Sequence, residues 1–309
     1  MRAAVTYMPT ILADIKHNLD TAESYTEKAS KDGAEIIIFP EFFTTGFALH
    51  TDLLKAIPAS NGVKEKMTQM SQKYDIVIGG SYLHYDKQKE NVFNTYGLFF
   101  PSGEIYEHSK DIPTGLESFC YAPGDNVSAF ETPLGRIGLV MCWEQLRWQT
   151  VRRMSGKVDL IVGGSCWWNF APEDGMAYDL HDINQKLAQQ APTQLATIMG
   201  VPVLHASHCA TFTGGTLTNI QTGCQRTIEG HAEAIDAYGK KVSKEMNAPG
   251  YQLVEITPGC VKQHVDIPED KIWIPELPAA LEQGFYQLNQ QYSKFYQEKV
   301  KIILAPSLP

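Results

Sequence analysis

The 309-residue sequence has no uninterrupted apolar run of about eighteen residues, the length from which a membrane-spanning helix is recognised. Its opening stretch, MRAAVTYMPT, is too short and too polar for the apolar core of a secretion signal. A basic surplus is also missing, since 26 Lys and Arg stand against 35 Asp and Glu. These absences predict a cytoplasmic protein that spans no membrane and binds no nucleic acid.

The sequence has little that indicates disulfides, metals or nucleotides. Its six cysteines are widely spaced and form no C-x-x-C pair, which favours reduced thiols over a disulfide framework. No G-x-G-x-x-G or Walker sequence is present, so nucleotide binding has no support. The H-x-x-H-C at 205–209 lacks a clear fourth metal ligand, and strand alternation would send His205 and His208 to opposite faces. We expect no metal and no cofactor.

What the chain does contain is the ordinary balance of a globular protein, 43% apolar and 20% charged residues. Apolar runs of strand length alternate with segments whose apolar residues recur at helical spacing. This alternation favours an α/β layered fold. We expect strands at 2–7, 34–41, 74–83, 94–100, 105–108, 136–141, 159–162, 201–207 and 251–257, a hairpin at 230–242, and helices at 14–31, 63–74, 144–154 and 184–199.

The tail of the chain differs from the rest. After Pro-containing turns, a helix is expected whose apolar face carries Leu281, Phe285, Leu288, Tyr292 and Phe295. Such a stripe is covered either by the chain's own domain or by a second subunit. We therefore predict one domain over residues 1–265, an extension over 266–309, and a homodimer or higher homo-oligomer.

Cys142 is the first candidate for chemistry. It stands where the apolar strand RIGLVM gives way to the helical segment beginning WEQLRW. Backbone N–H groups and the dipole at a helix start favour a thiolate, the reactive form of cysteine. A buried structural cysteine is the alternative, and a papain-like pairing of Cys142 with His205 or His208 is another.

Two further residues could work with this thiol. Glu41 ends the strand IIIFPE, and its position beside Pro40 and two phenylalanines predicts partial desolvation and a pKa raised toward that of a general base. Lys110 follows the strand IYEHS, from where it could stabilise a developing oxyanion. Taken singly, a capping glutamate and a solvated lysine are the plainer interpretations.

The segments around these three residues resemble one known family. Residues 36–47 read IIIFPEFFTTGF, residues 91–113 read NVFNTYGLFFPSGEIYEHSKDIP, and residues 134–144 read LGRIGLVMCWE. They are similar, in this order, to the glutamate, lysine and cysteine motifs of the nitrilase (carbon-nitrogen hydrolase) superfamily. The resemblance extends over roughly residues 1–260.

This resemblance implies a four-layer αββα sandwich and a Glu-Lys-Cys triad. Glu41 would take the proton of Cys142 and later activate water, while Lys110 and the backbone N–H of Trp143 would hold the oxyanion. Glu117, seven positions after Lys110, matches the family's second glutamate and would orient Lys110 and the leaving group. A thioester on Cys142 would be the intermediate.

The resemblance leaves the substrate class open. The C-W-E and K-x-x-P-T-x-x-E patterns are similar to true nitrilases, but residues 145–148 read QLRW where that branch has Asn and a Met-Pro pair. We therefore predict a hydrolase of a small amide or carbamoyl amide. The alternatives are a nitrilase that forms an acid and ammonia, and a catalytically silent relative that binds or assembles.

Three aromatic residues are candidates for the substrate pocket. Trp167 and Trp168 lie in GGSCWWNF, where the family places a pocket loop, and Phe47 closes the glutamate motif. The tryptophans could form an apolar wall for a flat or alkyl group. Core packing or a subunit contact is the plainer interpretation for both tryptophans.

Overall fold

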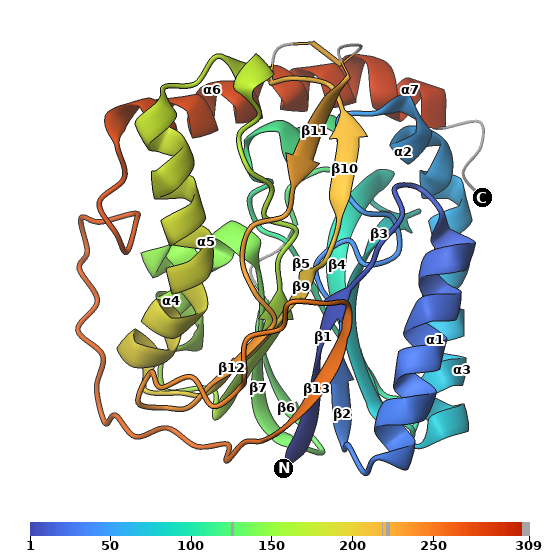
Figure 1. Ribbon diagram of the computed structural model, residues 1–309, viewed down its shortest axis with the longest axis vertical. Coiled ribbons are helices and arrows are strands. Elements are labelled where there is room, and N and C mark those ends of the chain that lie inside the picture. Colours follow the sequence, from blue (N-terminus) through green and yellow to red (C-terminus); the bar gives the residue numbers. More distant parts are fainter. Residues whose placement is uncertain (125–126, 218, 221–222, 305–309) are drawn as a thin grey trace.

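The computed structural model describes residues 1–124, 127–217, 219–220 and 223–304 (Figure 1). One half of its main sheet runs in the order β5-β4-β3-β2-β1, and β13 pairs with β1. The strands β1, β2 and β3 are parallel, whereas β4, β5 and β13 are antiparallel to their neighbours. The bounds of these strands are Arg2–Met8 for β1, Ile36–Ile38 for β2, Val77–Asp86 for β3, Asn91–Phe99 for β4, Ile105–Ser109 for β5 and Gly250–Glu255 for β13.

The other half of the sheet runs β9-β8-β7-β6, and β12 pairs with β9. Within the described residues, the ladders of the two halves join where β1 meets β9, at the pairs Tyr7–Ser207 and Met8–His208. A separate two-stranded ribbon is formed by β10 and β11. The bounds are Ala129–Thr132 for β6, Gly135–Met141 for β7, Leu160–Gly164 for β8, Val203–His208 for β9, Thr211–Gly214 for β10, Cys224–Thr227 for β11 and Glu233–Ile235 for β12.

Helices cover the outer face of each half (Figure 1). On one side, α1 (Ile15–Lys31) and α3 (Val63–Tyr74) pack against β1 to β4 through one apolar cluster. On the other, α4 (Trp148–Met154) and α5 (Tyr178–Met199) pack on β7 to β9. The α1 boundary follows from sequence, because the Asp14 side chain caps the helix by accepting from the N–H of His17.

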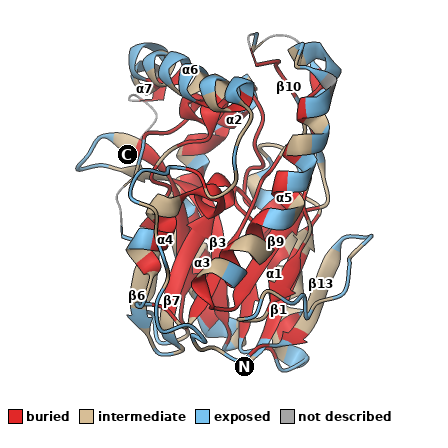
Figure 2. Cartoon of the chain, turned by 90° about the vertical axis from the view of Figure 1, so that its left-hand side faces the viewer, coloured by how far each residue is buried: buried red, intermediate tan, exposed pale blue. Residues whose placement is uncertain are grey.

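The inner faces of the two half-sheets pack on each other. Their core is built from apolar side chains of β1 to β4 on one side and β7 to β9 on the other, the buried interior that Figure 2 shows. Helix, sheet, sheet and helix are thus stacked as four layers, and the αββα sandwich predicted from the sequence is confirmed. No helix within the described ranges combines the length and apolar character that crossing a membrane requires.

The C-terminal helices α6 (Ala279–Phe295) and α7 (Lys301–Leu304) lie across one end of the sandwich (Figure 1). Their stripe faces the same chain: Leu281 and Phe285 pack with Trp143, and Tyr292 packs with Phe119. Shorter elements at this end are α2 (Thr51–Ala56) and the one- or two-turn helices η1 (Ile57–Gly62), η2 (Gly115–Phe119), η3 (Cys142–Leu146), η4 (Pro172–Asp174) and η5 (Tyr296–Val300).

Several elements differ from the sequence-based expectations: α5 begins at Tyr178 and not at 184, and α2, β6, β10 and β11 were not expected. The strand expected at 34–41 keeps ladder pairing only over Ile36–Ile38. The helix expected at 144–154 is split into η3 and α4 by Arg147, which is extended at φ −114° and ψ 131°. The hairpin expected at 230–242 keeps one bridge, Ile235 to Lys241, and its first strand, β12, also pairs with β9.

Candidate active site

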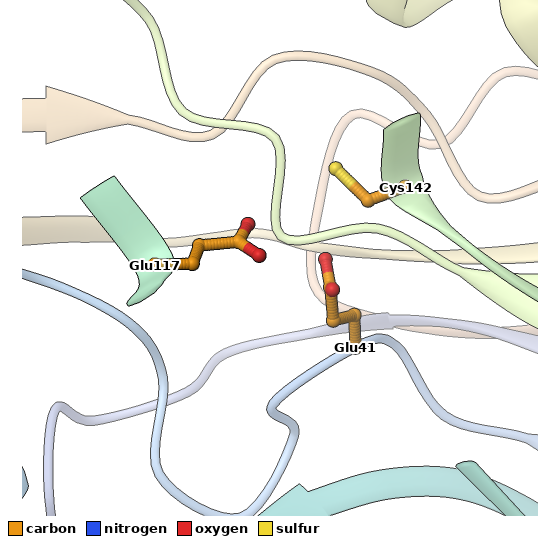
Figure 3. A group of neighbouring side chains, drawn as sticks. All are labelled: Glu41, Glu117 and Cys142. Atoms are coloured by element: carbon orange, nitrogen blue, oxygen red, sulfur yellow. The ribbon is translucent and has the colours of Figure 1, made fainter. Parts of the chain in front are cut away.

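Cys142 directly follows β7 at the end of the parallel strands, the edge at which α/β folds place their sites. Its backbone has φ 49°, a left-handed conformation that is uncommon for a residue with a side chain. The chain therefore turns sharply from strand to η3 at this residue. The side chain is 2% exposed and points to the carboxylates of Glu41 and Glu117 (Figure 3).

Glu41 is fully buried and follows β2 by two intervening residues. Its Oε1 accepts hydrogen bonds from the amide of Asn94 at 2.9 Å and from Nζ of Lys110 at 2.8 Å. Its Oε2 accepts from the backbone N–H of Cys166 at 3.1 Å. These donors fix the carboxylate beside the thiol.

Lys110 follows β5 and is also fully buried. Its Nζ donates to Glu41 at 2.8 Å and to Oε2 of Glu117 at 2.6 Å, so one ammonium bridges two carboxylates. Glu117 lies in η2, where the same oxygen also accepts from the N–H of Thr114 at 2.9 Å and from the hydroxyl of Tyr121. A buried charge needs such partners, and here each carboxylate has several.

The structure therefore brings the four predicted residues together from three segments that are far apart in the sequence, one of which carries both Lys110 and Glu117. Single ligand atoms of Glu41, Glu117 and Cys142 lie within 4.8 Å of one another. Two acids and a thiol at this spacing could hold a metal ion, but Lys110 Nζ already supplies the positive charge between the two carboxylates. The donor set thus suits proton transfer better than cation binding.

Burial and the neighbouring charges shift the pKa values of the residues in this cluster. Desolvation raises the pKa of Glu41 to about 7, with the nearby Lys110 opposing the rise and Glu117 adding to it. Desolvation and the Glu41 charge also raise the pKa of the Cys142 thiol well above its ordinary value. Burial lowers the pKa of Lys110, but Glu117 and Glu41 raise it by more, so the ammonium stays charged.

The expected thiolate at Cys142 is therefore wrong. Burial disfavours the charged sulfur more than the start of the one-turn helix η3 favours it. The resting residue is a neutral thiol beside a carboxylate whose pKa is close to neutral pH. Such a pair favours transfer of the proton during attack over a preformed thiolate.

Trp143 is the second residue of η3, so its N–H is one of those at a helix start that have no acceptor within the helix. It adjoins the nucleophile, as the oxyanion role assigned from the resemblance requires. Its ring stacks on Phe285 of α6, with centroids 5.3 Å apart and planes at 3°. The C-terminal helix thereby fixes the residue next to Cys142.

Several residues that support the site were not identified from the sequence. Asn94 lies in the N-T of the lysine motif, and Ser81 donates to its Oδ1 at 2.6 Å, which orients the amide toward Glu41. His208 donates from Nε2 to the backbone oxygen of Glu41 at 2.6 Å, and burial lowers its pKa to about 4. His208 is therefore a neutral residue that holds the backbone of Glu41. It is neither the papain-like base nor the metal ligand that the sequence left open as alternatives.

A buried ion pair joins the strand end of Lys110 to the turn of Cys142. His108 Nε2 contacts both carboxylate oxygens of Glu144 at 2.9 and 3.0 Å, and Glu144 also accepts from the backbone N–H of Met141 at 2.8 Å. The sequence positions of the pair could have indicated its role, because His108 stands two residues before Lys110 and Glu144 stands two residues after Cys142. The pair ties the ammonium and the thiol to each other.

Two adjoining cavities lead to the thiol. The inner cavity, of about 20 Å³, is lined by Cys142, Glu117, Trp167 and others, and the outer one, of about 480 Å³, opens beside α6. Trp167 is held by Asn184, which accepts from its Nε1 at 2.8 Å, and Trp168 lines both cavities. Phe47 instead packs on Phe42 in the core, 5.2 Å between centroids, and lines neither of them.

Comparison with known proteins agrees with this geometry. The profile of the carbon-nitrogen hydrolase family matches residues 2–243. The bifunctional nitrilase/nitrile hydratase NIT4B of Lupinus angustifolius is 30% identical over 165 residues, 47% of each chain. The omega-amidase NIT2 of Bos taurus is 34% identical over 140 residues, 41% of this chain and 49% of the bovine one. The chain thus spans about half the length of the curated relatives it matches.

Solved structures share the architecture. An amidase from Nesterenkonia sp. superposes with a TM-score of 0.66 at 18% identity, over 84% of this chain and 91% of that one. A mutant of the amidase from Nesterenkonia sp. AN1 in complex with butyramide gives 0.66 at 16% identity, over 82% and 90%. The αββα layers define an α/β sandwich whose architecture these solved amidases share. The chain belongs to the carbon-nitrogen hydrolase family.

Proposed function

We propose that the protein is a cysteine hydrolase that cleaves the carbon-nitrogen bond of a small amide, with Cys142 as nucleophile. The observation that carries this proposal is the buried cluster in which Cys142 faces Glu41 and Glu117 within 4.8 Å while Lys110 bridges the two acids. No cofactor is needed for this chemistry, because the thiol supplies the nucleophile and the glutamate the base.

The first half of the reaction forms a thioester. As Sγ of Cys142 attacks the substrate carbonyl, Glu41 takes the thiol proton, for which its pKa of about 7 is suited. The carbonyl oxygen becomes an oxyanion, held by Nζ of Lys110 and the N–H of Trp143. Glu41 then returns the proton to the nitrogen, which leaves as ammonia or an amine, and the acyl group stays on sulfur.

The second half releases the acid. Glu41 takes a proton from a water molecule that attacks the thioester, and the same two donors hold the second oxyanion. The C–S bond breaks and the proton returns to the thiolate, which restores the neutral thiol. Glu117 is the positioning residue, because its bond to Lys110 at 2.6 Å directs the ammonium toward the reacting centre.

The substrate class is the finer part of this proposal. Support for an amide comes from the relatives, which include an omega-amidase and an amidase solved with butyramide, and from the departure at residues 145–148 from the nitrilase pattern. A nitrilase is the second candidate, favoured by the likeness to the lupin nitrilase/nitrile hydratase. A panel of primary amides, carbamoyl amines and nitriles, assayed for ammonia, separates these activities.

A silent binding or assembly module is the alternative from another class, and thiol chemistry tests it. We expect iodoacetamide to label Cys142 stoichiometrically near neutral pH, and more slowly in Glu41→Gln, because the amide cannot accept the proton. The other buried cysteines, Cys120, Cys166 and Cys224, serve as internal controls. Labelling of Cys142 that is no faster than theirs, together with no ammonia release, would favour the binder.

We further propose that the protein is cytoplasmic and forms a homodimer or higher homo-oligomer. Support comes from the six free cysteines and from apolar side chains exposed near the extension, Ile272 at 52% and Tyr286 at 45%. Light scattering coupled to size exclusion measures the mass directly. A particle of 34.5 kDa would exclude an oligomer, and one of twice that mass would support a dimer.

A further inference from the structure

The outer cavity adjoins the inner cavity of the site but plays no part in the reaction described above. Its lining includes Thr114, Trp143, Trp168 and Phe170, and the same four residues also line the inner cavity that holds Cys142. At about 480 Å³ it has the size of a ligand pocket. The inner cavity, at about 20 Å³, has room for little more than one water-sized group.

These two volumes divide a substrate into two parts. Only the small reacting end, with a leaving group as small as ammonia, fits beside Cys142 and Glu117. The rest of the substrate would extend past the four shared residues into the outer cavity. A substrate with one bulky side fits this arrangement, whereas a substrate that is bulky on both sides of the carbon-nitrogen bond does not.

The wall of the outer cavity is largely apolar. Leu180 and Leu217 contribute from one side and Leu281, Phe285 and Leu288 of α6 from the other. Among the described residues that line either cavity there is no Lys, Arg or His. Burial of an alkyl or aryl group is therefore favourable here, and a distal carboxylate would have no cationic partner.

The single acid of the outer wall, Asp174, is already satisfied. Its two oxygens accept from Arg226 at 2.6 and 2.7 Å and from the backbone N–H groups of Ala171 and Leu217 at 2.8 and 3.0 Å. The guanidinium also stacks over Trp168, 4.9 Å from the ring centroid. The pair braces the cavity wall and offers no free charge to a cationic tail.

We propose, on the basis of the proposed function, that the substrate is a primary amide with an uncharged apolar acyl chain, and that α6 sets how long this chain can be. Gly284 is the key position, since it lines the cavity and a Cβ built on it meets no heavy atom within 4 Å. A larger side chain at Gly284 would occupy the space of the acyl chain without a clash. It would also suit the helix better than glycine does.

The test is a series of primary amides from acetamide to hexanamide, with the six-carbon amide that carries a terminal carboxylate. We expect kcat/KM to rise about threefold to fourfold with each methylene group. For the charged amide, kcat/KM should be at least about a hundredfold lower than for hexanamide. Gly284→Leu should lower kcat/KM for hexanamide at least about tenfold more than for acetamide. Gln291→Leu, on the exposed face of α6, is the matched control and should leave the ratio unchanged.

Each other outcome has a distinct meaning. A flat chain-length profile, a preference for the charged amide, or an unchanged ratio in Gly284→Leu would overturn this inference while the hydrolase proposal stands. Turnover of N-hexylacetamide in place of hexanamide would overturn the placement of the acyl chain. Loss of all amide turnover in a protein whose Cys142 is not acylated would instead overturn the proposed function itself.

Discussion

At the scale of single residues, the account depends on how Glu41 is held. Its carboxylate accepts from Asn94, Lys110 and Cys166, and burial raises its pKa to about 7. Three donors stabilise the charged form against desolvation, so the group remains a base that ionises near neutral pH. The thiol that it serves is neutral, which makes the base necessary.

This arrangement predicts a pH dependence. We expect kcat/KM to rise as pH increases through about 7, because Glu41 accepts the thiol proton only as a carboxylate. The raised pKa of Lys110 keeps the oxyanion site charged, so no loss is expected up to about pH 9. A profile that is flat from about pH 5.5 to 8.5 would contradict the role of Glu41.

Asn94 provides a further test at this scale. In Asn94→Ala the acid limb should move to higher pH, because the carboxylate loses a hydrogen bond that favours its charged form. Asn91→Ala is the matched control, since that amide donates to the backbone oxygen of Lys89 at the far end of β4. An equal displacement of the limb in both variants would show that Asn94 does not act through Glu41.

The residues that sequence could predict are those with a local signal. Glu41, Lys110 and Cys142 each follow a strand within a motif, and the structure brings their side chains together. The neutral state of Cys142 could not be read locally, because it follows from packing by segments distant in sequence. The role of His208 could not be predicted from the local sequence either, because its partner Glu41 is 167 positions away in the chain.

At the scale of elements, the ends of β5 and β7 are braced by the His108–Glu144 pair. Burial raises the pKa of Glu144, but His108 and Arg147 lower it by more, to well below its ordinary value. Burial lowers the pKa of His108, but Glu144 raises it above its ordinary value. The pair therefore remains ionised at neutral pH and fixes Lys110 relative to Cys142.

Removal of one partner of this pair should destabilise the protein. Glu144→Gln leaves the buried His108 without its carboxylate, and we expect a loss of about 3–5 kcal/mol in the free energy of unfolding, measured with urea. Glu27→Gln breaks the exposed pair with Lys31 and should leave the free energy of unfolding nearly unchanged. Equal losses of stability in the two variants would show that the His108–Glu144 pair does not brace the ends of β5 and β7.

The contact between α6 and η3 is a second element-scale feature. Phe285→Ala removes the ring that stacks on Trp143. We expect it to lower the free energy of unfolding by about 3–5 kcal/mol and to lower kcat. Its neighbour Tyr286 is 45% exposed, so Tyr286→Ala is the matched control and should cost much less. Thermal unfolding and turnover of both variants check this prediction. Similar losses of stability and activity in the two variants would show that the contact between Phe285 and Trp143 does not support the site.

At the scale of the whole molecule, the extension closes the site of the same chain. The sequence predicted the apolar stripe of α6, but it could not tell which surface covers it, because both choices bury the same residues. The stripe packs on Trp143 and Phe119, and Asn289 of α6 donates to the backbone oxygen of Pro113 at 2.7 Å. The α/β class could be predicted because strand and helix patterns alternate along most of the chain, whereas the four αββα layers were implied by the family resemblance.

A chain that ends at residue 265 tests the extension. We expect it to lose activity and stability together, because the partners of Trp143 and Phe119 on α6 are removed and large apolar surfaces become exposed. Solubility, circular dichroism and amide turnover of the shortened chain provide the measurement. Full activity in a soluble shortened chain would show that the extension is dispensable for the site.

The most direct test of the central claim is mass spectrometry of the protein quenched in acid during turnover of a primary amide. The account predicts an acyl group on the peptide that contains Cys142 and on none of the other five cysteines. Cys142→Ala should show neither the adduct nor turnover. Ammonia release that persists in Cys142→Ala, or an acyl group on another residue, would contradict the account.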